Sequence, residues 1–157
     1  MNSFEAHLNE LLVHTYRSIE LMEQQMLENN RGLNLTISEF HLLEAVGMPE
    51  ECPQGKTISE LSEQMGISLP SVTLAINKLV KKGFVEKHKN ERDGRLVHVR
   101  LTRDGVKANR LHQYFHRKMI SSITIDLTEE EKEAMVRGIQ KLNQYLNGNL
   151  QKDREDL

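Results

Sequence analysis

Residues 68–102, SLPSVTLAINKLVKKGFVEKHKNERDGRLVHVRLT, decide the fold of this 157-residue chain. Ser68 is a helix-capping residue, and the apolar spacing that follows it predicts a helix that ends at Gly83. Residues 84–88 and 96–101 lie on either side of an Arg-Asp-Gly-Arg tip, and the second segment alternates apolar and polar side chains. This pattern predicts two antiparallel strands joined as a hairpin. A helix followed by a basic hairpin is therefore the centre of the fold.

Three capping boxes mark the starts of further helices. In each box a Thr is followed three residues later by Glu, at Thr36, Thr57 and Thr128. The second box begins a short helix that ends near Met65, and a turn at Gly66 leads into the helix of the opening stretch. Two helices joined in this way are a helix-turn-helix. With the hairpin after it, the pattern predicts a winged helix-turn-helix.

Composition excludes several classes of protein. With 38% hydrophobic and 28% charged residues, the chain is expected to fold as one soluble domain, and no apolar run reaches membrane-spanning length. The N-terminus lacks the basic and apolar regions of a signal peptide, so we expect a cytoplasmic protein. A single cysteine excludes an intrachain disulfide. No nucleophile–base pair or Gly-rich phosphate loop is evident, so we do not expect an enzyme or a resident cofactor.

The charges are unevenly distributed along the chain. Residues 1–67 carry a net charge of −8, residues 68–110 carry +7 and residues 111–157 carry −1, so the overall charge of −2 conceals a basic block. A basic block within an acidic chain is typical of a surface that binds a polyanion. The alternative is a solvated, lysine-rich face, although acidic residues are normally interspersed in such a face.

One face of the predicted helix at 68–83 is left for a partner. Its small hydroxyl and amide side chains suit base edges and its lysines suit phosphates, so we predict double-stranded DNA as that partner. The predicted buried residues are Val72, Ala75, Ile76, Leu79 and Val80, and the candidate DNA contacts are Ser68, Ser71, Thr73, Leu74, Asn77, Lys78 and Lys81.

Long helices are predicted on both sides of this region. Residues 4–30 carry a narrow apolar stripe on an acidic helix, and residues 103–150 carry similar stripes on two further helices. The stripes either close a monomeric helical bundle or form the interface of a homodimer. Their length favours the homodimer.

Residues from about 35 to 105 resemble the MarR family of bacterial transcription regulators. The run ERDGRLVHVRLTRDG (91–105) is similar to the wing signature of that family, an Asp-x-Arg tip followed by a strand that ends in Leu-Thr-x-x-Gly. The resemblance implies that Asp93 braces the hairpin and that Arg95 enters the minor groove, with Arg92 as a further contact. Gly94 departs from the pattern, since many relatives carry arginine or a bulkier residue there.

The resemblance implies a mainly α fold with a small β-hairpin wing. Residues 34–103 would form the winged helix-turn-helix, and residues 1–33 and 104–157 would form a helical dimerisation region of the same intertwined domain. In this family the two recognition helices of a dimer lie about one DNA turn apart on a pseudo-palindrome. We therefore expect a homodimeric, sequence-specific transcription regulator that acts as a repressor.

Two segments resemble one branch of the family, which represses fatty-acid synthesis genes in Gram-positive bacteria. They are TISEFHLLEAVG (36–47) and LTRDGVKANRLHQYFHRKMI (101–120). Such relatives respond to long-chain acyl groups, so the resemblance implies an acyl effector and acyl carrier protein as a partner. The implied effector site lies in the cleft between the dimerisation and DNA-binding regions. Its candidate residues are His41, His112, Phe115, His116 and Met119.

Zinc sensing is the competing hypothesis for the effector. The MarR-type zinc regulators similarly place one His on the second helix and two on the fifth, four residues apart. The alternative metal ligands are therefore His41, His112 and His116, with Glu20 or Glu23 as a further ligand. Cys52 does not lie where that branch places its thiol. Each histidine could also have a purely structural role. For the hairpin, the alternative is that it binds protein or acidic lipid instead of DNA.

Overall fold

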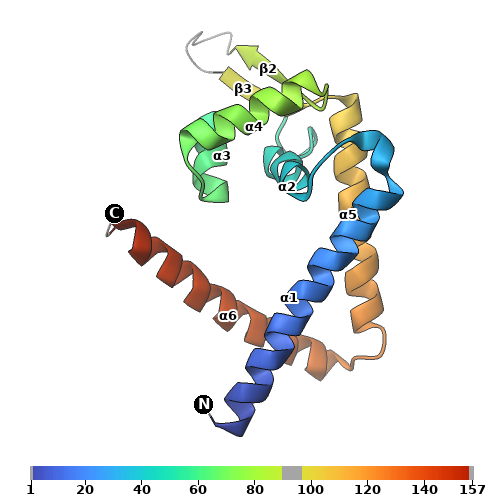
Figure 1. Cartoon of the computed structure of the whole chain (residues 1–157), viewed down its shortest axis with the longest axis vertical. Coiled ribbons are helices and arrows are strands. Elements are labelled where there is room, and N and C mark those ends of the chain that lie inside the picture. Colours follow the sequence, from blue (N-terminus) through green and yellow to red (C-terminus); the bar gives the residue numbers. More distant parts are fainter. Residues whose placement is uncertain (1, 90–96, 156–157) are drawn as a thin grey trace. The chain divides into compact units, whose positions relative to one another are not determined.

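The structure, a computed structural model, describes residues 2–89 and 97–155, with the backbone alone from residue 149 (Figure 1). The chain divides into two compact units, Met1–Phe115 and His116–Leu157, which we treat as separate bodies. The predicted fold class, mainly α with a small β wing, is confirmed. The elements are α1 (Ser3–Asn29), the 3-10 turn η1 (Arg31–Leu33), α2 (Ile37–Val46), β1 (Lys56–Thr57), α3 (Ile58–Met65), α4 (Leu69–Lys81), β2 (Val85–Lys89), β3 (Val97–Leu101), α5 (Arg103–Thr124) and α6 (Glu129–Glu155).

Polar caps set the starts of the helices where the sequence predicts them. At the start of α2, the Thr36 hydroxyl accepts a hydrogen bond from Glu39 N–H, and Glu39 Oε2 accepts one from Thr36 N–H at 2.8 Å. The same reciprocal box closes at the starts of α3 and α6. Each box satisfies two backbone groups that a helix end leaves without partners.

The helices α3 and α4 form the predicted helix-turn-helix. Gly66 follows α3 in the left-handed conformation, with φ of 68°, which glycine adopts without a steric penalty. The Ser62 hydroxyl donates to the Ile67 carbonyl oxygen at 2.7 Å across this turn. Ser68 then caps α4 by accepting a hydrogen bond from Ser71 N–H. Local hydrogen bonds therefore fix the angle at which α4 leaves α3.

The buried face of α4 is narrower than the sequence predicts. Val72, Ile76 and Leu79 are fully buried, and Ala75 is half-buried. Val80, by contrast, is 38% exposed, so its predicted burial is wrong. Buried positions at i, i+4 and i+7 already cover the contact with the core, and position 80 lies at the edge of that stripe.

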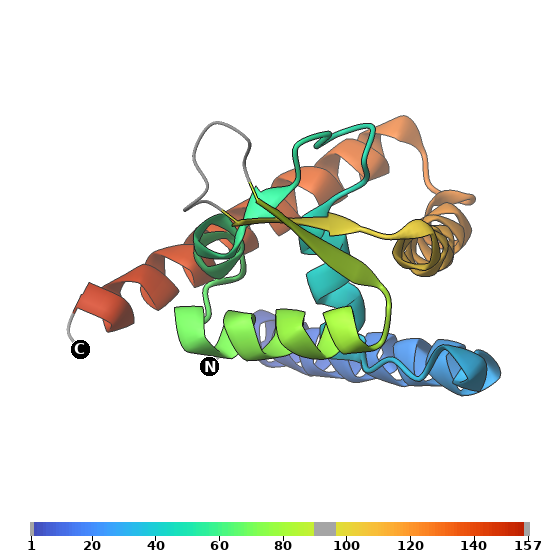
Figure 2. The same cartoon turned by 90° about the horizontal axis from the view of Figure 1, so that it is seen from above.

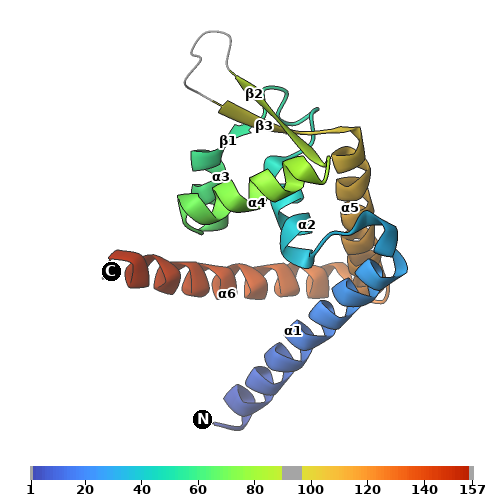
Figure 3. The same cartoon turned by 45° about the horizontal axis from the view of Figure 1, so that its top comes forward.

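The wing strands belong to a three-stranded sheet rather than to an isolated hairpin. The strands β2 and β3 pair antiparallel from Val85↔Leu101 to Lys89↔Val97, as predicted. The sequence analysis missed β1, which pairs with the other edge of β3 to give the order β1-β3-β2 (Figure 3). A strand of two residues is too short to show an alternating pattern.

The start of α5 is pressed against the base of the sheet. The Thr102 hydroxyl donates to the Gly83 carbonyl oxygen at 2.6 Å and accepts from Gly105 N–H at 3.1 Å. Any side chain at position 105 would collide with the carbonyl oxygen of Phe84. The first turn of α5 is therefore joined without a gap to the residues that connect α4 to β2.

The helix α2 is the centre of the hydrophobic core. Phe40, Leu43 and Val46 are at most 1% exposed, and the core continues into Leu61 of α3 and Val99 of β3. Helices α3 and α4 and the strands surround α2, as Figure 2 shows. A helix that is apolar on nearly every side is stable only when it is enclosed in this way.

The flanking helices have the predicted length. On α1, Leu8, Leu12 and Met22 are each more than 40% exposed, and on α6 Ile139 and Leu146 are about half exposed. These apolar stripes are available for a partner helix, as the dimerisation hypothesis requires, and that hypothesis stays a prediction. None of the described helices is both long and apolar enough to span a membrane.

A nearly buried ion pair connects the end of α4 to the start of α2. Lys82 Nζ donates to both carboxylate oxygens of Glu39, at 2.9 and 2.8 Å, and to the carbonyl oxygen of Asn34 at 2.7 Å. Glu39 is 8% exposed. The same carboxylate caps α2, so a single side chain connects two helix ends.

Replacing Lys82 by methionine should lower the free energy of unfolding by about 1–3 kcal/mol at neutral pH, because the Glu39 carboxylate stays buried and loses a charged donor. The exposed neighbour Lys81 provides the matched control, and Lys81→Met should change the free energy of unfolding by less than about 0.5 kcal/mol. Urea unfolding measures both values. Equal losses in the two variants would contradict a special role for Lys82.

The effect of Lys82→Met should also depend on pH. Burial raises the pKa of Glu39, and hydrogen bonds from Lys82 and from the backbone N–H of Thr36 outweigh burial, so the net pKa lies below its ordinary value of 4.5. A carboxyl with a lowered folded-state pKa stabilises the protein above its unfolded pKa and loses that contribution as the pH falls through the folded value. The difference between wild type and variant should therefore shrink below pH 4.5.

Candidate functional site

The outward face of α4 presents the residues that the sequence predicts for DNA contact. This face lies beside β2 at the surface of the first unit (Figure 3). Leu74 is 59% exposed and Thr73 is half-buried, and the other candidates are exposed: Ser68, Ser71, Asn77, Lys78 and Lys81. The structure thus brings all of the predicted α4 contacts to one accessible surface.

Several polar atoms on this face already have partners. The Ser68 and Ser71 hydroxyls lie 2.8 Å apart, and the Thr73 hydroxyl donates to the Leu69 carbonyl oxygen at 2.7 Å. Asn77 Oδ1 accepts from Lys87 Nζ of β2 at 2.7 Å. The amide NH2 of Asn77 is therefore the end of that side chain left for an outside acceptor, a distinction that the sequence cannot provide.

Cations extend from α4 onto the neighbouring strand. Lys78 and Lys81 occupy the last turn of α4, and Lys87 and Lys89 are exposed on β2. Lys78, Lys81 and Lys89 form no ion pair with any other described residue. Cations without internal partners on one surface attract phosphates and release counterions when they bind them.

The predicted wing tip lies outside the described residues. Arg92, Asp93 and Arg95 fall within 90–96, so their roles as contact, brace and minor-groove probe stay predictions. The strands on either side of them pair antiparallel, as predicted. The hairpin that carries the tip is therefore established, while its contacts are not described.

A second group of candidate side chains comes together where α1, α2 and α5 meet. His112 of α5 is 1% exposed and is stacked on Phe40, with ring centroids 5.4 Å apart. Its Nε2 lies 3.8 Å from Glu23 Oε1, and its Nδ1 lies 3.4 Å from Glu44 Oε2. His41 Nε2 lies 3.5 Å from the same oxygen of Glu23. We call Glu23, His41 and His112 the histidine cluster.

The histidine cluster agrees in part with the predicted effector residues. His41 and His112 are brought together, and Phe115 packs against the core of the same unit. His116 and Met119 belong to the second unit, so their participation stays a prediction. Of the two acidic candidates, Glu23 is buried beside the histidines, whereas Glu20 is exposed.

Glu44 is a neighbour of the cluster that the sequence analysis missed. It follows His41 by three residues, which places the two side chains on the same side of α2. That spacing was a usable signal, although many surface helices carry such pairs. Glu44 itself is exposed, so it closes the cluster on the solvent side.

The donor atoms of the histidine cluster have a spacing close to that of a metal site. One donor atom from each of the three residues lies within 4.8 Å of the others. In a tetrahedral zinc site with bonds near 2.1 Å, ligand atoms are about 3.4 Å apart. The distances of 3.5 and 3.8 Å from Glu23 to the two histidines are near this value. A carboxylate and two imidazoles are also a ligand set that zinc accepts.

Comparison with known proteins relates this chain to bacterial transcription regulators. The model of the MarR family matches residues 35–97. The HTH-type transcriptional regulator BilQ of Clostridium symbiosum is 30% identical over 123 residues, which cover 76% of this chain and 78% of BilQ. YfiV of Bacillus subtilis, a further HTH-type regulator, is 37% identical over 90 residues, and the match spans only 56% of its length.

Among solved structures, the fold is similar to that of Streptococcus pneumoniae FabT in complex with DNA. The TM-score is 0.83 at 31% sequence identity, and the match covers 92% of this chain and 98% of the FabT chain. The similarity therefore extends beyond the helix-turn-helix to the flanking helices.

Proposed function

This chain belongs to the MarR family of transcription regulators, and on that premise we propose that it is a homodimeric DNA-binding repressor of fatty-acid synthesis genes. Long-chain acyl groups on acyl carrier protein are its proposed effector. Membership in a family of transcription regulators confirms the prediction that the chain is not an enzyme.

The observation that carries DNA binding is the exposed face of α4 with the basic strand beside it. Asn77 presents a donor amide, and Lys78 and Lys81, which form no ion pair with any residue in 2–89 or 97–155, occupy the last turn of the helix. Lysines fix the position of a helix on the phosphates, and the amide supplies a contact to a base edge. The likeness to FabT, which was solved in complex with DNA, supports DNA as the partner.

The hydrogen bond from Lys87 narrows what Asn77 is expected to read. An asparagine that recognises adenine uses both its oxygen and its NH2 in a bidentate contact. Here the oxygen is engaged by Lys87, so the amide offers donors alone. Acceptor atoms in the major groove, which are guanine O6 and N7, thymine O4 and adenine N7, are therefore the expected targets, whereas cytosine presents only a donor.

We expect selection from random-sequence DNA to yield an inverted repeat with an acceptor-bearing base at the Asn77 position. Asn77→Ala should relax the preference at that position and cost about 1–3 kcal/mol on the selected site. Lys81→Ala is the matched contrast, because loss of a phosphate contact weakens all sequences alike and reduces the salt slope by about 1. If the selection enriches no repeated sequence, the hypothesis of sequence-specific DNA binding is contradicted. The alternative, in which the hairpin binds protein or acidic lipid, would then be favoured.

The fatty-acid assignment rests on sequence resemblance and on the likeness to FabT. The segments that carry the resemblance supply Phe40, His41 and His112, which pack against one another at one end of the core. A polar group at the mouth of an apolar site is a common way to orient an amphipathic ligand. A long acyl chain with a polar thioester end fits that description.

Long-chain acyl–acyl carrier protein should tighten operator binding by roughly 5- to 150-fold, the usual range of coupling between two ligands of one protein. Fluorescence anisotropy with a labelled operator measures the change, and acyl carrier protein without an acyl chain is the control. Native mass spectrometry should detect the complex. If the two forms of the carrier protein act alike, the acyl chain is not the effector.

Zinc-responsive regulation of metal uptake genes is a second candidate function, and the histidine cluster favours it. Its three donor atoms come from three helices that are distant in sequence, so their convergence is a property of the fold. Zinc bound there would tie α1 and α5 to α2. His116 is the proposed fourth ligand on sequence grounds alone.

Zinc binding should be stoichiometric in wild type if the second candidate is right, as measured by calorimetry against a competing chelator. Loss of a residue that only supports a metal ligand typically lowers metal affinity by roughly 10- to 100-fold. Glu23→Gln removes a proposed ligand itself, so it should lower the zinc affinity by at least that factor. The exposed Glu20 of the same helix offers the control, Glu20→Gln, which should bind zinc like wild type. If wild type, Glu23→Gln and Glu20→Gln bind zinc with equal affinity, the histidine cluster is not a zinc site.

A further inference from the structure

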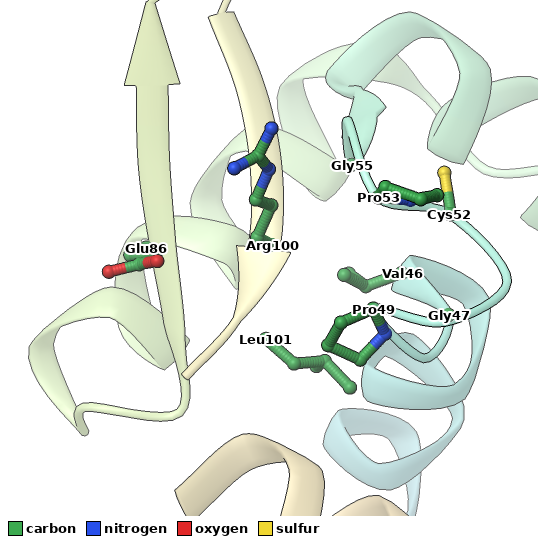
Figure 4. A pocket seen from close by; sticks show the side chains of 9 residues that line it. All are labelled: Val46, Gly47, Pro49, Cys52, Pro53, Gly55, Glu86, Arg100 and Leu101. Atoms are coloured by element: carbon green, nitrogen blue, oxygen red, sulfur yellow. The ribbon is translucent and has the colours of Figure 1, made fainter. Parts of the chain in front are cut away.

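A cavity of about 200 Å³ lies away from α4 and from the histidine cluster. It is enclosed by the end of α2, the loop of residues 47–55 and the strands β2 and β3 (Figure 4). An engineered apolar cavity of about 150 Å³ is large enough to hold benzene. The space is therefore sufficient for a small organic molecule. We call it the loop pocket.

The loop that covers the pocket is held on the sheet by close backbone packing. Gly55 has φ of 76°, and a side chain there would collide with the carbonyl oxygen of Val99. Gly47 ends α2 with φ of 84° and turns the chain into the loop. Both ends of the loop are thus fixed by conformations that favour glycine, and the pocket is part of the fold.

One polar group in the wall of the pocket is not satisfied by the protein. Arg100 Nε is buried and makes no hydrogen bond with any part of the chain that the structure describes. A buried donor without a partner is destabilising, so such groups in native proteins need an explanation. An arginine side chain stays charged, and its Nε–H and one Nη–H together match the two oxygens of a carboxylate.

The other charges near the pocket are already engaged. Glu86 is the cross-strand partner of Arg100, but its carboxylate pairs with His88 Nε2 at 2.7 Å. In Figure 4 the Glu86 side chain points away from Val46, Pro49 and Leu101. Lys56 Nζ donates to the Ala45 carbonyl oxygen and to Gln64, and it lies near Gly47. An anion beside Arg100 would thus meet two cations and a carboxylate that is already paired.

Another part of the pocket lining is aliphatic. Val46 and Leu101 are buried core residues, and Pro49 lies beside them (Figure 4). This wall suits a short hydrocarbon body and offers no partner for further polar groups.

We propose that the loop pocket binds a short aliphatic monocarboxylate, with the carboxylate paired to Arg100 and the hydrocarbon part packed on Val46, Pro49 and Leu101. This site is separate from the proposed acyl or zinc site and from the proposed DNA surface. Because Arg100 belongs to β3, a bound acid would link the loop after α2 to the central strand of the wing sheet. The proposal concerns binding alone, so it does not depend on the proposed function.

Isovalerate titrated into the full-length protein is the test, with binding measured by calorimetry and by methyl NMR. The methyl signals of Val46 and Leu101 should shift in wild type, which needs no variant. Arg100→Gln should weaken binding by at least about tenfold, since a charge-assisted contact is lost. Arg103→Gln, at an exposed position three residues later, is the matched control and should bind like wild type.

Further arms of the experiment define the ligand class. Arg100→Lys keeps the charge without the planar fork, so it should bind more weakly than wild type and more tightly than Arg100→Gln. Cys52→Leu narrows the cavity and should weaken isovalerate binding while the melting temperature is retained. Absence of methyl shifts in wild type would overturn the proposal. Inorganic phosphate that binds as tightly as isovalerate, with the same dependence on Arg100, would also overturn it, because the aliphatic wall would then contribute nothing.

Discussion

The burial of α2 is the constraint on which the rest of the first unit depends. Its apolar side chains are covered on nearly every side, so α3, α4 and the sheet are positioned by contact with one short helix. Its two ends are held by lysines from other elements, Lys82 at the start and Lys56 near the end. Its one polar edge carries His41 and Glu44. Through that edge α2 also contacts Glu23 of α1 and His112 of α5.

Most of the architecture could be predicted from the sequence, because its signals are local. Capping boxes, the glycine after α3 and the alternation in β3 each specify a structure within a few residues, and the structure confirms them. The strand β1 could not be predicted in the same way. Its two residues become a strand only because β3 lies next to them. Val80 was assigned to the core because helical spacing alone does not give the width of the buried face.

The candidate sites show the same division between local and distant contacts. The outward residues of α4 follow from helical periodicity, so sequence was sufficient to find them. The engagement of Asn77 by Lys87 depends on how α4 packs on β2 and was not predictable. The histidine cluster joins residues from three helices, and only the fold distinguishes Glu23 from Glu20. The wing tip was predicted from a motif, and it remains a prediction from that motif.

The contact between Gly105 and the carbonyl oxygen of Phe84 has a mechanical consequence. Since there is no room for even a methyl group between them, α5 and the base of the sheet cannot approach more closely at this point. Thr102 adds hydrogen bonds to both sides of the same joint. The first turn of α5 and the base of the sheet are therefore packed as one unit at this point. The first turn of α5 thus forms a rigid junction between the long flanking helix and the strands of the wing.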